Sequence, residues 1–128
     1  MRLALILLGM LLAQPAWAEW EKWRTVETAT YFWNPARVRK TDEGRRVWTM
    51  TSYQKGMATH GSEMILYEFD CDGERERILA WFKYSGPNGT GTRYDIADFG
   101  PEVTRWKVIP PAATIEPLLN AVCKLPLE

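Results

Sequence analysis

The chain has 128 residues, with 16 acidic and 16 basic side chains that give a formal net charge of zero. This length leaves room for one domain and little more. The neutral balance argues against a general nucleic-acid-binding protein, because such proteins usually carry a pronounced basic excess.

The first element in chain order has the features of a secretory signal peptide. A positive charge near the start is followed by an almost continuous apolar run over residues 3–12. This run is too short to span a bilayer, which takes about 20 residues. Ala16 and Ala18 place small residues at the two positions that signal peptidase reads. We therefore expect residues 1–18 to be removed, leaving a domain of residues 19–128 that works outside the cytoplasm, without a membrane span.

Two segments with strand composition come next. Residues 23–33 are rich in β-branched and aromatic side chains and predict one or two strands. Asn34-Pro35 ends this run, because proline cannot donate to a strand ladder. Residues 37–54 predict a hairpin that turns at residues 42–44, and its second arm alternates from one side to the other. The number of residues in this loop stays open, so its cross-strand partners are not assigned.

The hairpin over residues 63–84 is the most constrained of the predicted elements. Asp72-Gly73 is typical of a two-residue type I′ turn, in which glycine supplies a positive φ. With this turn as the loop, opposite charges and apolar side chains fall opposite one another, as cross-strand energetics favour. The predicted pairs are Asp70–Arg75, Phe69–Glu76, Glu68–Arg77, Tyr67–Ile78, Leu66–Leu79, Ile65–Ala80 and Met64–Trp81.

The two cysteines, Cys71 and Cys123, predict a disulfide, since an even count in an exported chain favours a bridge. Two free thiols or half of a metal site are the alternatives. The single histidine and the lack of a CxxC motif weigh against a metal site. In the predicted hairpin, Cys71 shares a face with Tyr67 and Phe69. This face should therefore look toward the segment that carries Cys123.

The segment before Pro126 predicts a helix. Thr114 is the expected N-cap, and Glu116 lies in the first turn, where a carboxylate suits the helix dipole. Apolar residues recur at spacings of three and four and form one stripe. The members of this stripe are Ile115, Leu118, Leu119, Val122 and Cys123.

Residues 85–92 form a glycine-rich segment that predicts a flexible loop, since it lacks the GxxxxGK[ST] pattern of a phosphate-binding loop. A short strand around residues 93–96 and a last strand over residues 106–109 follow. The fold class is therefore α+β: an antiparallel sheet of about five or six strands with one C-terminal helix packed on it, and a single disulfide.

The sequence offers little for catalysis. His60 is the only histidine, and it lies in a turn-like segment where we expect it to be exposed to solvent. Asp95 and Asp98 are interpreted as members of a solvated loop and not as an acid–base pair. We therefore expect no enzyme, no cofactor and no metal site.

A cluster of basic residues near the first hairpin turn is the leading candidate for a binding site. If these side chains gather at one sheet edge, they form a positive patch suited to a protein surface or glycan that is acidic. The more ordinary interpretation is edge protection, in which cations discourage sheet-to-sheet aggregation. Trp20 and Trp33 are candidates either for contact aromatics or for the core. The basic residues are Arg37, Arg39, Lys40, Arg45 and Arg46.

An ordered set of features runs along the mature chain. Its members are Trp23 before Tyr31-Phe32; Val38, Gly44 and Val47-Trp48 in the first hairpin; Phe69-Asp70-Cys71 before a turn; Trp106, Ile109 and Pro111; and Leu118, Val122 and Cys123. Together these features resemble the surface-adhesin protein E-like family of Gram-negative bacteria over about residues 23–123.

The resemblance implies an antiparallel sheet with a disulfide-tethered helix, located at the cell surface or in the periplasm. Because the founding adhesin binds host matrix and serum proteins, it also implies an exported, non-enzymatic binding domain. A periplasmic structural or accessory protein is the alternative. The ligand and the oligomeric state stay open.

Overall fold

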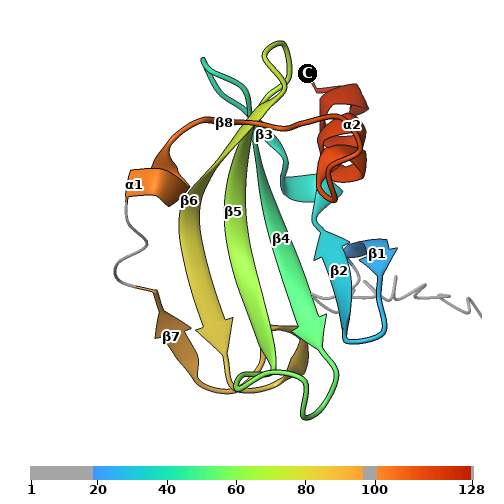
Figure 1. Cartoon of the computed structure of the whole chain (residues 1–128), viewed down its shortest axis with the longest axis vertical. Helices are drawn as coiled ribbons and strands as arrows, with labels where there is room; N and C mark the ends of the chain where they lie inside the picture. Colours follow the sequence, from blue (N-terminus) through green and yellow to red (C-terminus); the bar gives the residue numbers. More distant parts are fainter. Residues whose placement is uncertain (1–18, 97–100, 128) are drawn as a thin grey trace, which may run out of the picture.

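A computed structural model describes residues 19–96 and 101–127 of the chain (Figure 1). One antiparallel sheet forms most of this part, and a helix near the C-terminus packs against it. The strands are β1 (Glu21–Thr25), β2 (Ala29–Trp33), β3 (Arg39–Lys40), β4 (Arg45–Tyr53), β5 (Ser62–Asp70), β6 (Arg75–Tyr84), β7 (Arg93–Asp95) and β8 (Lys107–Val108). The helical elements are the 3-10 turns η2 (Pro35–Arg37) and η3 (Pro87–Gly89), and the helices α1 (Pro101–Thr104) and α2 (Glu116–Lys124).

The sheet is larger than predicted, with eight strands where five or six were expected. Six of them lie side by side in the order β1-β2-β4-β5-β6-β7, while β3 pairs with β4 and β8 pairs with β6. The shortest strands, β3, β7 and β8, lie in segments that the sequence predicted as strands, and each pairs with only part of a long neighbour. Since α1 and α2 have only four and nine residues, the described part is mostly β and not α+β.

The first half of the sheet follows the sequence closely. The run predicted as one or two strands is the β1–β2 hairpin, and it ends at Asn34, where Pro35 begins η2. The next predicted hairpin is β3–β4, which turns between Thr41 and Gly44 and is closed by a 2.8 Å hydrogen bond from the Thr41 N–H to the Gly44 carbonyl. The prediction of one or two strands and the prediction of a hairpin after them are both confirmed.

The β5–β6 hairpin is confirmed in position but only partly in register. The four predicted pairs nearest the turn are present, from Asp70–Arg75 to Tyr67–Ile78. Beyond them a bulge leaves Leu79 without an opposite residue, so each later prediction is wrong by one position. The observed pairs are Leu66–Ala80, Ile65–Trp81 and Met64–Phe82.

The turn of this hairpin also differs from the prediction. Four residues, Cys71 to Glu74, connect the strands, so the connection is not a two-residue type I′ turn. The positive φ lies at Glu74 (φ 50°), whereas Gly73 has no such conformation. Four-residue loops are usually built around a type I turn, which needs no glycine at its centre. The Gly73 N–H instead donates to the Asp70 carboxylate at 3.0 Å.

Helix α2 covers the upper part of one face of the sheet, beside β2 and β4 (Figure 1). We call this side the helix face and the other side the opposite face; successive residues of a strand alternate between them. The core lies between α2 and the helix face. Its buried members are Trp33, Val38, Val47, Phe69, Ile109, Leu118, Leu119 and Val122.

The N-cap of α2 lies one residue later than predicted. Ile115 occupies the N-cap position and makes no side-chain cap, so the assignment of Thr114 is wrong. The Glu116 carboxylate instead accepts a 2.9 Å hydrogen bond from the N–H of Ala112. The predicted apolar stripe is correct, since its central members are buried. The Cys71–Cys123 disulfide is present, with a Cα–Cα distance of 5.8 Å, and joins α2 to the β5–β6 turn.

Candidate binding surface

The basic residues of the first hairpin divide between the two faces of the sheet. Arg39 lies directly opposite Arg46, and Lys40 lies directly opposite Arg45. Because neighbours along a strand alternate, the first pair lies on the opposite face and the second pair on the helix face. Arg37 belongs to η2, where its largely exposed side chain lies 3.5 Å from Glu19.

Arg45 is engaged by the end of α2. Its guanidinium donates hydrogen bonds to the carbonyls of Val122 (2.7 Å) and Leu125 (2.5 Å). The last carbonyls of a helix lack intrahelical donors and carry the negative end of the helix dipole, so a cation there is stabilising. Arg45 therefore attaches β4 to α2, and its charge is not free for a partner.

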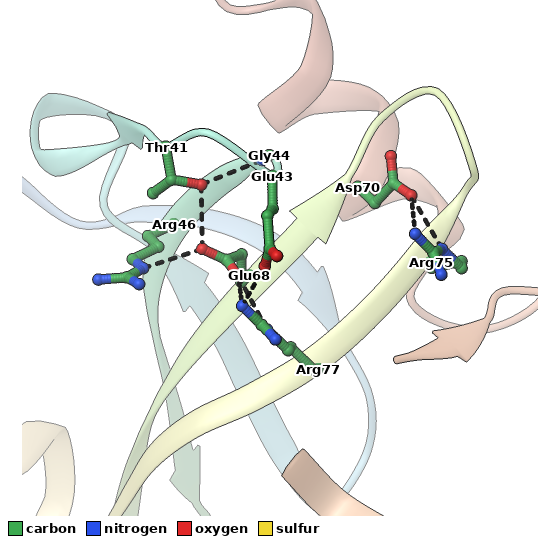
Figure 2. Close-up of polar contacts among 8 residues, drawn as sticks. All are labelled: Thr41, Glu43, Gly44, Arg46, Glu68, Asp70, Arg75 and Arg77. Atoms are coloured by element: carbon green, nitrogen blue, oxygen red, sulfur yellow. Dashed lines mark hydrogen bonds and ion pairs between the residues drawn. The ribbon is translucent and has the colours of Figure 1, made fainter. Parts of the chain in front are cut away.

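Glu68 is the centre of a charged cluster on the opposite face (Figure 2). Its side chain is only 1% exposed. It accepts hydrogen bonds from the Thr41 hydroxyl (3.0 Å), from Nε of Arg46 (2.9 Å) and from Nε of Arg77 (2.8 Å). Arg46, Glu68 and Arg77 are register partners, so they form a straight row across β4, β5 and β6.

The partners of Glu68 decide its charge state. Burial opposes ionisation, but the hydrogen bonds from Arg46, Arg77 and Thr41 outweigh it and hold the pKa of Glu68 below its ordinary value. Glu68 is therefore an ionised carboxylate between two cations at neutral pH. The sequence had predicted the Glu68–Arg77 pair. The pairing of Arg46 with Glu68 was not predicted, because the cross-strand partners of the first hairpin were not assigned.

Trp106 covers the outer end of this row. Its ring lies 4.4 Å from the guanidinium of Arg77 and 5.1 Å from that of Arg75, within the range of cation–π attraction. Arg75 also pairs with Asp70 at 2.7 Å (Figure 2). The N–H of Gly73 and then the Arg75 guanidinium lower the pKa of Asp70. These contacts fix two guanidinium groups at the upper end of the sheet.

An aromatic groove lies below this row on the opposite face. It has a volume of about 390 Å³. The rings of Trp48 and Phe82 stack with centroids 5.9 Å apart, and the guanidinium of Arg93 lies 4.8 Å from the Phe82 ring. Of the two candidate contact aromatics, Trp20 lines this groove, whereas Trp33 is in the core. The lining residues are Glu19, Trp20, Asn34, Arg37, Trp48, Met64, Phe82, Tyr84 and Arg93.

His60 was predicted to be exposed, and this is wrong. Its side chain is only 15% exposed, because Nε2 lies 2.8 Å from the carboxylate of Glu63 and its ring meets Tyr53 edge-on. The same carboxylate accepts hydrogen bonds from the Tyr53 hydroxyl (2.9 Å) and from the indole of Trp81 (3.2 Å). Burial and then the Glu63 charge raise the pKa of Tyr53. With three donors around Glu63, the cluster fastens the β4–β5 loop to the sheet.

The remaining sequence candidates are placed as follows. Asp95 is exposed and pairs with Arg93 at 3.1 Å, while Asp98 lies outside the described residues. The glycine-rich loop predicted to be flexible is tied to the sheet. There the Ser62 hydroxyl donates to the carbonyl of Gly86 and accepts from the N–H of Gly89.

Residues 19–96 and 101–127 contain no group of three His, Cys, Asp or Glu side chains placed to hold a metal ion. No helix within these ranges has the length and apolar character needed to cross a membrane. What the described part presents is a disulfide-linked β domain with a charged row and an aromatic groove on one face.

Comparison with known families identifies the chain. The family model described as surface-adhesin protein E matches residues 17–124, and the chain therefore belongs to the surface-adhesin protein E family. This membership indicates an adhesin-like surface protein. No curated protein and no solved structure gives a significant match.

Proposed function

We propose that this chain is an exported, non-enzymatic binding domain that engages a host matrix or serum protein at the cell surface. The observation that carries the proposal is the family match, which extends over residues 17–124. Removal of residues 1–18 by signal peptidase is part of the proposal, and it gives a mature chain that begins at Glu19. N-terminal sequencing of the exported protein tests that cleavage.

Exposed cations beside the first hairpin supply a contact surface for such a partner. Arg37, Arg39 and Lys40 are all exposed, and Arg46 keeps about half of its side chain in solvent (47%) although it pairs with Glu68. Exposed charges at the edge of an interface accelerate association with an oppositely charged surface, and salt weakens this effect. An acidic partner surface fits these residues.

Location and binding are tested together. We expect protease added to intact cells to digest the protein, and the purified mature chain to bind some members of a panel of immobilised matrix and serum proteins. Protection until the outer membrane is permeabilised, combined with no binding to the panel, would favour the alternative function. That alternative is a periplasmic structural or accessory protein.

The role of the cations is tested by charge removal. A triple variant, Arg37→Ala, Arg39→Ala and Lys40→Ala, should bind its matrix partner more slowly at low salt, with a smaller difference at high salt. The control variant, Lys22→Ala, Lys55→Ala and Lys124→Ala, loses the same charge elsewhere on the surface. Equal loss in both variants would assign the effect to net charge and not to the hairpin.

A further inference from the structure

A groove beside β3 has a different lining from the aromatic groove. One wall is formed by η2, Val38 and β3, and the other by residues 125–127, which follow α2. Its volume is about 370 Å³. Pro35, Leu125 and Leu127 are half-buried members of this lining, so these apolar side chains keep part of their surface accessible. We call it the edge groove.

The edge groove lies along a strand edge that has no partner strand. Within the described residues, β3 pairs with β4 alone. The Thr41 N–H donates across the hairpin to the Gly44 carbonyl, and the backbone groups of successive strand residues alternate in direction. The N–H and C=O of Lys40 therefore point away from β4. Since both residues of β3 but no residue of β4 line the groove, an extended chain in it can form main-chain hydrogen bonds with this edge.

The edge groove also carries positive charge that the described part of the chain does not neutralise. Arg39 and Lys40 line it, and both side chains are exposed. The guanidinium of Arg39 donates to the carbonyls of Val38 (3.1 Å) and Ala36 (3.5 Å), which hold it beside η2 without cancelling its charge. No carboxylate of the described part forms an ion pair with either cation. A ligand that carries carboxylates therefore matches this groove.

Edge, charge and apolar lining together favour one kind of occupant, an extended acidic peptide segment. A sulfated glycan would meet the cations, but it has no strand backbone for the edge of β3 and no apolar side chain for the lining. A basic segment would be repelled. Because Arg39 and Lys40 lie on different faces of the sheet, two adjacent acidic residues of an extended segment can reach both.

From these observations we propose that the edge groove binds an extended acidic segment of a protein partner, which adds to the free edge of β3. The backbone of the segment pairs with the N–H and C=O of Lys40, and its adjacent carboxylates face Arg39 and Lys40. A neighbouring apolar side chain packs against Pro35 and Leu127. This inference rests on the proposed function, because it names the part of a matrix or serum protein that the hairpin cations meet.

The experiment titrates the isotope-labelled mature protein with a synthetic heptapeptide of the repeat Val-Glu-Glu, and amide chemical shifts report binding by NMR. The comparison probes are a Val-Lys-Lys heptapeptide, a backbone N-methylated copy of the acidic peptide, and a heparin tetrasaccharide. We expect the acidic peptide to shift the amides of β3 and of residues 125–127 saturably, at up to millimolar concentration, and the other two peptides to bind more weakly. No saturable shift with the acidic peptide, equal binding of either other peptide, or binding of the heparin fragment alone would overturn the proposal. Edge protection would then be the role of these cations.

Variants locate the site. Arg39→Gln combined with Lys40→Gln should weaken binding of the acidic peptide roughly fivefold at low salt, as expected for two lost pairs between exposed charges. The matched control, Lys22→Gln combined with Lys55→Gln, removes the same charge elsewhere and should bind as the native chain does. Equal weakening in both double variants would refute the assignment. Glu128→Gln removes a carboxylate that follows Leu127 in the sequence, so it should bind the acidic peptide at least as tightly, and weaker binding would contradict the proposal.

Competition separates this inference from the proposed function. An excess of the Val-Glu-Glu peptide should displace a matrix or serum protein that the mature chain binds. Binding of such a protein that the peptide does not displace would overturn the assignment of the edge groove and leave the proposed function standing. Peptide binding at β3 without binding to any member of the protein panel would support the edge groove and overturn only the host partner.

Discussion

At the scale of single residues, Glu68 connects more of the molecule than any sequence pattern indicated. A turn residue, Thr41, and two strand residues, Arg46 and Arg77, donate to one buried carboxylate. Such a carboxylate is stabilising only while all its partners are present, because a buried charge that loses its partners is costly. The ionised form of Glu68 therefore stabilises the pairing of β4, β5 and β6 at the upper end of the sheet.

Acid should therefore destabilise the upper end of the sheet. Because the pKa of Glu68 is lower in the folded chain than its ordinary value of 4.5, its contribution is complete above that pH and is lost as the pH falls below it. Glu68→Gln should lower the free energy of unfolding by about 2–3 kcal/mol at neutral pH, and it should flatten the fall below pH 4.5. Urea unfolding over a pH series measures both effects.

Glu43 supplies the control for this experiment. It also pairs with Arg77, but 60% of its side chain is exposed. Glu43→Gln should therefore change the stability little. An acid profile that is identical in the native chain and in Glu68→Gln would contradict the role assigned to Glu68.

At the scale of elements, the β5–β6 turn places its conformational strain at one residue. Glu74 adopts the left-handed conformation (φ 50°), which costs an L-residue about 1–2 kcal/mol. Glu74→Gly should relieve part of this cost and raise the unfolding free energy by up to about 1 kcal/mol. Thermal unfolding followed by circular dichroism detects the change as a higher Tm.

Gly73→Ala in the same turn should have the opposite sign. A Cβ at this position would lie 2.4 Å from Oδ2 of Asp70 and 3.0 Å from Nε of Arg75, so it would push apart the ion pair at the base of the turn. The expected result is a lower Tm. If both variants moved Tm in the same direction, the assignment of the strained position would be wrong.

At the scale of the whole molecule, one covalent bond holds the helix to the sheet. Cys71 and Cys123 are 52 residues apart in the sequence, so the bridge closes a long loop. The chain-entropy relation assigns about 4 kcal/mol to such a loop. Reduction should therefore remove a large part of the stability of a domain of this size, for which about 5–15 kcal/mol is usual.

Urea unfolding with and without a reducing agent measures this contribution. The double variant Cys71→Ser and Cys123→Ser should match the reduced protein and should no longer respond to the reducing agent. An unchanged urea midpoint on reduction would show that α2 is held by its apolar stripe and by Arg45 alone.

The sequence predicted the fold best where the controlling interactions are local. Charges that face each other near the β5–β6 turn gave four correct pairs. The bulge at Leu79 was not predictable, because the contacts that go with it join residues that are far apart in the sequence. It places Trp81 on the face where its indole reaches Glu63, and it places Phe82 beside Trp48. The number of strands was underestimated although every observed strand lies in a segment predicted to contain strands, because the total for the sheet was set at five or six.

The candidate binding surface was less predictable. Neighbouring cations in the sequence looked like one patch, but Arg45 and Arg46 lie on different faces because strand residues alternate. The aromatic groove escaped notice because its lining residues extend from Glu19 to Arg93 in the sequence. Of these residues, Trp20 and Arg37 had been singled out as binding candidates, and the sequence did not decide whether Trp20 was a contact residue or a core residue. Asn34 had been assigned only to the end of a strand.

The like charges that face each other in the β3–β4 hairpin also affect the order of folding. Arg39 opposite Arg46 and Lys40 opposite Arg45 repel each other, so this hairpin is unfavourable by itself. The compensating partners come from β5 and from the end of α2, where the carbonyls that Arg45 contacts are 77 and 80 residues further along the chain. We therefore expect β3 to pair with β4 late, after β4 has paired with β5 and packed against α2. Substitutions in β3 should accelerate unfolding while leaving the refolding rate almost unchanged.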